Sequence, residues 1–83
     1  MNTLIAEQIK APIITFVRFL KNVMVISLSD GRTLSIPIAW YSKLSKATEK
    51  QLKHFEISPG GYGIHWSDID EDLSVWGFLF PGV

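Results

Sequence analysis

The sequence has no cysteine among its 83 residues, and this absence excludes both a disulfide framework and a thiolate metal site. Because small secreted domains usually depend on such crosslinks, the absence favours a cytoplasmic location. No apolar run approaches the roughly 18–20 residues that a membrane-spanning helix needs. The N-terminus also lacks a basic segment followed by an apolar run, so neither a membrane span nor a signal peptide is predicted.

Lysine and arginine are absent from residues 54–83, although the whole chain has eight basic and eight acidic residues. Residues 1–53 therefore carry a net charge of +5, and residues 54–83 carry a net charge of −5. Such a charge asymmetry can steer a charged partner to one face of a molecule. The alternative is that the two halves neutralise each other within the fold.

A chain of this length permits one domain, which we expect over residues 12–83, with residues 1–11 as an N-terminal extension or first element. β-Branched and aromatic residues are concentrated in residues 13–20, 23–28 and 33–38, as is typical of strands. Tight turns are indicated at residues 21–22 and at the Asp-Gly pair of residues 30–31. We therefore predict an antiparallel β-meander.

Alternation of side chains along these strands indicates which residues face the core. On the third strand, the residues predicted to face the core are Leu34, Ile36 and Ile38. On the second strand, one face carries Val23, Val25 and Ser27, and the other carries Met24, Ile26 and Leu28. Pro37 cannot donate a ladder hydrogen bond, so it marks the end of the third strand or an edge.

Two short helices are predicted next, over residues 38–45 and 49–54. Trp40 and Leu44 are four residues apart, which places them on one helix face. Thr48 and Gln51 fit a capping box at the start of the second helix. Lysines spaced by three and four residues predict a basic outer face, with a merely solvated face as the alternative. These lysines are Lys43, Lys46, Lys50 and Lys53.

The C-terminal part is expected to contain a short extended segment at residues 55–57, a turn, and a strand at residues 62–66. That strand could pair with residues 55–57 or with the meander. A final helix is predicted from Asp68, with Ile69, Leu73, Trp76 and Phe80 packing inward and Pro81-Gly82 ending it. The fold class is therefore α+β, an antiparallel meander with short helices on one face.

Residues 60–75 combine three glycines, a tyrosine, a tryptophan, a histidine and four carboxylates, a mixture that core packing does not require. Aromatic side chains supply much of the energy at protein interfaces. The candidate partner-binding residues are Tyr62, His65, Trp66, Asp68, Asp70, Glu71, Asp72 and Trp76. The structural alternative is that Gly61 and Gly63 permit close packing, His65 bonds a nearby aspartate, Trp66 fills the core, and Asp68 or Asp70 caps the last helix.

A metal site is not predicted in this segment. His65 with Asp68 and Asp70 provides fewer ligands than iron or zinc sites usually need. Asp68, Asp70 and Asp72 match the first ligands of a calcium-binding EF-hand loop, but leucine stands where that loop needs glycine and glutamate. The glycines also lack the pattern of a phosphate-binding loop. We therefore expect no cofactor.

The ordered motifs of the chain are similar to those of a known family. They are Ser29-Asp30-Gly31-Arg32-Thr33, Ile36-Pro37-Ile38-Ala39-Trp40-Tyr41, Leu44, Ala47-Thr48, Gly61-Tyr62-Gly63-Ile64-His65-Trp66 and Asp68-Ile69-Asp70-Glu71-Asp72-Leu73-Ser74-Val75. Over residues 13–79 the chain thus resembles the bacterial domain-of-unknown-function family 2442. Ser42 and Ser67 depart from the proline that relatives often carry there.

The resemblance implies a small α+β domain with no established activity. Some relatives carry this domain ahead of a helix-turn-helix segment, and others are encoded beside a second small protein, as in a toxin–antitoxin pair. Because residues up to Val83 include no helix-turn-helix segment, direct nucleic-acid binding is not expected.

The function that we predict is a non-catalytic, antitoxin-like interaction module, whose partner is a small basic protein encoded alongside. Homodimerisation through the apolar C-terminal segment is compatible with this function. One alternative is a component of a nucleic-acid-associated transcriptional regulator that uses the lysine face. The other is a small enzyme with His65 and Asp70 as an acid/base pair, although the chain has no nucleophile motif.

Overall fold

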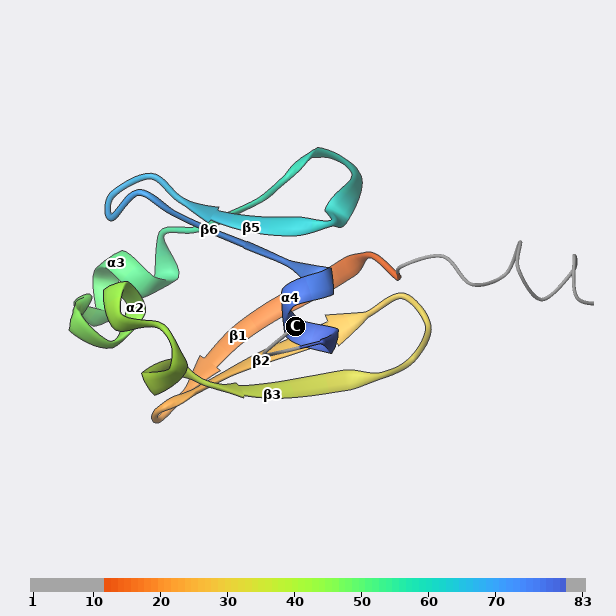
Figure 1. Ribbon diagram of the computed structural model, residues 1–83, viewed down its shortest axis with the longest axis horizontal. Helices are drawn as coiled ribbons and strands as arrows, with labels where there is room; N and C mark the ends of the chain where they lie inside the picture. Colours follow the sequence, from red (N-terminus) through yellow and green to blue (C-terminus); the bar gives the residue numbers. More distant parts are fainter. Residues whose placement is uncertain (1–11, 81–83) are drawn as a thin grey trace, which may run out of the picture.

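Two three-stranded antiparallel sheets face a common core in the computed structural model, which describes residues 12–80 (Figure 1). Sheet A contains β1 (Ile14–Leu20), β2 (Val23–Leu28) and β3 (Thr33–Pro37), in that order. Sheet B contains β4 (Glu56–Ile57), β5 (Gly63–Trp66) and β6 (Glu71–Ser74), in that order. The helical elements are η1 (Ile38–Trp40), α2 (Ser42–Lys46), α3 (Glu49–Lys53), η2 (Pro59–Gly61) and α4 (Val75–Leu79).

The predicted α+β fold is confirmed. The predictions for residues 1–11, for Pro81-Gly82 and for Val83 lie outside the described residues. Within residues 12–80, no helix is long and apolar enough to cross a membrane.

The meander of sheet A follows the prediction closely, because its turns and its alternation are encoded locally. Asn22 and Gly31 adopt positive φ angles of 66° and 95° in the two turns. Pro37 is the last residue of β3, where its missing N–H costs little. The inward side chains of β2 are completely or almost completely buried, so β2 forms the centre of the core.

The first predicted helix is interrupted. Tyr41 has an extended backbone (φ −122°, ψ 110°), which separates η1 from α2. The i, i+4 relation holds only within one continuous helix, so Leu44 is fully buried while Trp40 is 55% exposed. The prediction that these two side chains share a face is therefore wrong.

The capping box of α3 is confirmed. The backbone N–H of Gln51 donates to the hydroxyl of Thr48 at 3.1 Å, and the backbone N–H of Thr48 donates to the side-chain oxygen of Gln51 at 3.0 Å.

The predicted helix from Asp68 is wrong. Residues 67–70 form a turn in which Asp70 has a positive φ of 53°, and the chain then returns as β6 alongside β5. The helix α4 begins only at Val75, where the Ser74 hydroxyl accepts the N–H of Gly77 at 3.1 Å. Consequently neither Asp68 nor Asp70 caps a helix, and the predicted inward stripe does not form, because Phe80 is 51% exposed.

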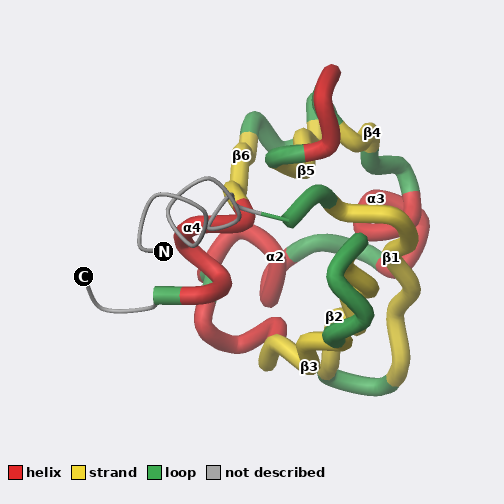
Figure 2. Tube along the Cα trace, turned by 90° about the vertical axis from the view of Figure 1, so that its right-hand side faces the viewer, coloured by secondary structure: helices red, strands yellow, loops and turns green. Residues whose placement is uncertain are grey.

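Strand β5 pairs with β4 on one side and with β6 on the other, which resolves the pairing left open by the sequence. Sheet B lies above sheet A in Figure 1. Figure 2 shows that α4 lies on the β6 side of the molecule and α3 on the β4 side. The core cluster draws Ile14, Met24 and Ile26 from sheet A, Ile64 and Trp66 from sheet B, and Val75 and Phe78 from α4.

Candidate functional site

The aromatic candidates of residues 60–76 divide into one core residue and two surface residues. Trp66 is fully buried, its indole N–H donates to the carbonyl of Leu52 at 2.9 Å, and its ring lies 6.5 Å from that of Phe55. Tyr62 and Trp76 are 48% and 50% exposed. Trp66 thus serves stability, and only Tyr62 and Trp76 are available for contact with a partner.

Two of the four carboxylates in the acidic segment are paired with histidines. His65 Nδ1 lies 2.7 Å from Asp72 Oδ1, as expected for directly opposite residues of β5 and β6. His54 Nδ1 lies 2.8 Å from Asp68 Oδ2. The hydrogen bond and the charge of Asp68 raise the pKa of His54 above its usual value of 6.5. The sequence offered no spacing that links His54 to Asp68, so this pair was missed.

The predicted acid/base pair of His65 and Asp70 does not form, because the carboxylate that contacts His65 belongs to Asp72. The carbonyl of Asp70 accepts a hydrogen bond from the Lys43 ammonium at 2.7 Å, which ties α2 to the turn between β5 and β6. Within the described residues, no three histidine, aspartate or glutamate side chains lie together as metal ligands would.

A hollow of about 670 Å³, here called the aromatic hollow, lies between η1, β6 and α4. It is lined by Trp40, Tyr41, Asp72, Leu73, Ser74, Gly77 and Phe78. The rings of Tyr41 and Phe78 meet edge to face, with their centroids 6.4 Å apart. Burial, and then the negative charge of Glu71, raise the pKa of Tyr41.

A second hollow of about 340 Å³ extends from β6 toward the turn that precedes β5. It is lined by Ser58, Tyr62, Gly63, Ile64, Asp72, Leu73 and Ser74. The absence of a side chain at Gly63 shapes this region, since a Cβ atom there would lie 3.0 Å from the Leu73 carbonyl oxygen. Both hollows therefore border residues 72–74 of β6.

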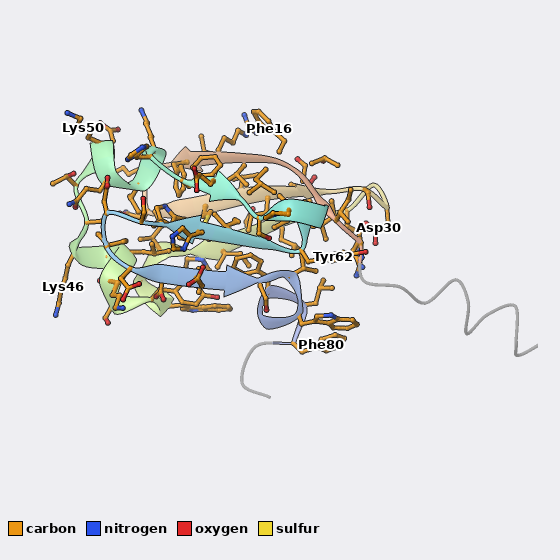
Figure 3. All side chains as sticks on the ribbon, turned by 90° about the horizontal axis from the view of Figure 1, so that it is seen from above. Phe16, Asp30, Lys46, Lys50, Tyr62 and Phe80 are labelled. Atoms are coloured by element: carbon orange, nitrogen blue, oxygen red, sulfur yellow. The ribbon has the colours of Figure 1, made fainter. Side chains whose placement is uncertain are left out.

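The four lysines of the predicted basic face belong to two separate helices, with Lys43 and Lys46 in α2 and Lys50 and Lys53 in α3. Figure 3 shows that Lys46 and Lys50 point to opposite sides of this end of the molecule. Lys53 Nζ lies 3.8 Å from Glu49.

Direct ion pairs do not join the two oppositely charged halves within residues 12–80. The pairs Arg32–Asp30 and Lys53–Glu49 lie inside the positive half, and both histidine–aspartate pairs lie inside the negative half. The described residues therefore keep most of the charge asymmetry on the surface.

Two solved structures share this fold. An uncharacterised protein from Rhodospirillum rubrum superimposes with a TM-score of 0.75 at 30% identity, over 84% of this chain and 87% of that chain. An uncharacterised protein from Chromobacterium violaceum, studied in solution, gives a TM-score of 0.70 at 26% identity, over 93% of this chain and 71% of that chain.

Curated proteins give no match to this chain. The family model described as "Protein of unknown function (DUF2442)" matches residues 14–83. Because the match spans more than half of the sequence, the chain belongs to the DUF2442 family of proteins of unknown function.

Proposed function

We propose that this protein is a non-catalytic interaction module that binds a small basic protein, as an antitoxin binds its toxin. The observation that carries the proposal is the position of the acidic residues beside an aromatic hollow. Asp70 immediately precedes β6 and Glu71 is its first residue, and residues 72–74 of β6 line the hollow together with Trp40, Tyr41 and Phe78. Acidic groups on a rim accelerate and orient the encounter, while buried aromatic contacts supply affinity.

The resemblance to relatives that are encoded beside a second small protein supports the same function. So does the retained charge asymmetry, because a negative surface attracts a positive partner over about one Debye length.

The first test is a pull-down from the native host at moderate salt, followed by mass spectrometry. We expect one stoichiometric small basic protein. A monodisperse protein that captures nothing would contradict the proposal.

The second test asks whether the acidic side chains near β6, rather than the shape of the aromatic hollow alone, accelerate association with the partner. The double variant Asp70→Asn/Glu71→Gln leaves both histidine pairs intact, and it should slow association by about tenfold at low salt. The control Asp30→Asn/Glu49→Gln makes the same change of charge in the positive half and should leave association nearly unchanged. Equal association rates for the wild type and the Asp70→Asn/Glu71→Gln variant at low salt would contradict the proposal.

A further inference from the structure

Strand β6 is the outer strand of sheet B on the side of the aromatic hollow. Its only strand neighbour within the described residues is β5, and the blue strand borders the sheet in Figure 3. An outer strand presents one row of backbone N–H and C=O groups away from its sheet, and such a row can pair with an extended segment of another chain.

The register identifies the groups that point outward. The N–H of Val75 donates to the carbonyl of Tyr62 at 2.9 Å, so Val75 faces β5. Because the direction alternates along an antiparallel strand, Leu73 also faces β5, whereas Asp72 and Ser74 face away. The N–H of Asp72 agrees with this assignment, since it donates to the Glu71 carboxylate at 3.2 Å rather than to β5.

The two hollows border the same three residues of β6, residues 72–74. Successive side chains of a strand point to opposite faces. A strand added to β6 would therefore direct one set of side chains toward the aromatic hollow and the alternate set toward the hollow beside Tyr62 and Ser58.

We propose that β6 is a strand-addition site, at which an extended segment of the basic partner pairs with the outward backbone N–H and C=O of Asp72 and with the N–H of Ser74, whose carbonyl belongs to the first turn of α4. An apolar side chain of that segment enters the aromatic hollow, and basic side chains lie beside Asp70, Glu71 and Asp72. This inference rests on the proposed function and adds the mode of binding to it.

Charge favours a basic segment over a second copy of this chain. Pairing β6 with β6 of another copy would add two Glu71 and two Asp72 carboxylates along one short four-residue pairing, and like charges on closely paired strands repel. A segment with lysine or arginine at alternate positions instead gains from the same acids.

A synthetic peptide in which lysine alternates with valine is a suitable probe, and NMR of the labelled protein is the readout. We expect the amide signals of Asp72 and Ser74 to shift and to gain protection from hydrogen exchange. The same peptide with N-methyl groups on the central amides of both edges keeps its charge and side chains but cannot donate to a neighbouring strand, so it should bind about tenfold more weakly. Equal binding of the two peptides, or shifts confined to other elements, would overturn the proposal.

A matched pair of protein variants tests whether the outward N–H of β6 is needed for peptide binding. Asp72→Pro and Asp72→Ala both remove the carboxylate, but only proline removes the outward N–H and places a ring on the edge. We expect the peptide to bind Asp72→Pro about tenfold more weakly than Asp72→Ala. If circular dichroism shows that Asp72→Pro does not fold, the comparison of the two peptides on the wild-type protein still tests strand addition.

Two further outcomes are informative about the occupant. A wild-type dimer that Asp72→Pro converts to a monomer would show that a second copy fills the edge, and this would overturn the proposal. Equal capture of the native partner by Asp72→Pro and Asp72→Ala would refute strand addition and leave the interaction module standing. Failure of the wild-type protein to capture any partner would instead remove the proposed function.

Discussion

Gly31 and Gly61 adopt the same left-handed backbone but have different neighbours. Their φ angles are +95° and +82°, yet a Cβ atom on Gly31 would meet nothing within 4 Å, whereas one on Gly61 would lie 2.8 Å from the Ile13 Cβ. Gly31→Ala should therefore lower the free energy of unfolding by about 1–2 kcal/mol through backbone strain alone. Gly61→Ala should cost about 1–3 kcal/mol more, because the new methyl group overpacks.

Urea denaturation of the two glycine variants measures this difference directly. Equal costs for Gly31→Ala and Gly61→Ala would show that the chain near Ile13 moves aside without penalty, contrary to our expectation.

The His54–Asp68 contact gives a pH-dependent contribution to stability. Because the Asp68 carboxylate raises the pKa of folded His54 above 6.5, the contribution is fully present below that value. It is lost as the pH rises through the folded pKa. Asp68→Asn should lower the pKa of His54, as measured by NMR titration of its ring protons. Asp72→Asn is the matched control, since Asp72 contacts His65 and not His54, and a lowered His54 pKa in that control would contradict the assignment.

Single residues were predictable from the sequence where their environment is local. The capping box of Thr48 and Gln51 was predicted because the two residues are three apart, whereas Trp66 was named as a partner-binding candidate, with the core as the alternative, and its burial came from the structure. His54 and Asp68 are 14 residues apart, and their contact exists only because α3 and the turn after β5 meet in space. No periodicity encodes such a meeting, so this part of the site could not be found.

At the scale of elements, helix α3 is capped at its N-terminus and also contacts a core residue of sheet B. Its Leu52 carbonyl accepts the indole N–H of Trp66, and its N-terminus is held by the reciprocal bonds of Thr48 and Gln51. Thr48→Ala should lower the stability of the whole domain by about 1 kcal/mol, which corresponds to a fall of about 4–8 °C in Tm for a domain of this size.

Thr48→Ser is the control for the cap of α3, because serine retains the accepting hydroxyl. It should unfold within about a degree or two of the wild type. A full loss of stability in Thr48→Ser would indicate that the methyl group, rather than the cap, is responsible.

The meander and the last element differ in how their sequences specify them. Sheet A has a turn signal at each reversal and clear alternation, so its strands were predicted within two residues. Residues 71–79 change from β6 to α4 without glycine or proline between them. Their strand character depends on pairing Leu73 with Ile64 and Glu71 with Trp66, and these cross-strand pairs of the β5–β6 hairpin override the helical spacing of the apolar residues.

At the scale of the whole molecule, the charge asymmetry read from the sequence remains after folding, because the ion pairs of the described residues stay within each half. The distribution over the surface, however, required the structure. The lysines lie on two helices that Figure 3 shows at one end, while Asp72 lines a hollow that no linear pattern revealed.

Both sheets share one core, so the molecule should unfold as one unit. Ile26 of sheet A and Trp66 of sheet B are both fully buried in the same cluster, and small domains with a continuous core unfold cooperatively. Ile26→Val should therefore lower the stability by about 0.5–1.5 kcal/mol. It should shift the far-ultraviolet transition and the near-ultraviolet tryptophan transition by the same amount, whereas Ser35→Ala, at an exposed position of β3, should shift neither.

Two separated midpoints would mean that sheet B can unfold while sheet A persists. The edge of β6 would then be presented by a part of the chain with its own stability, and partner binding would protect that part alone.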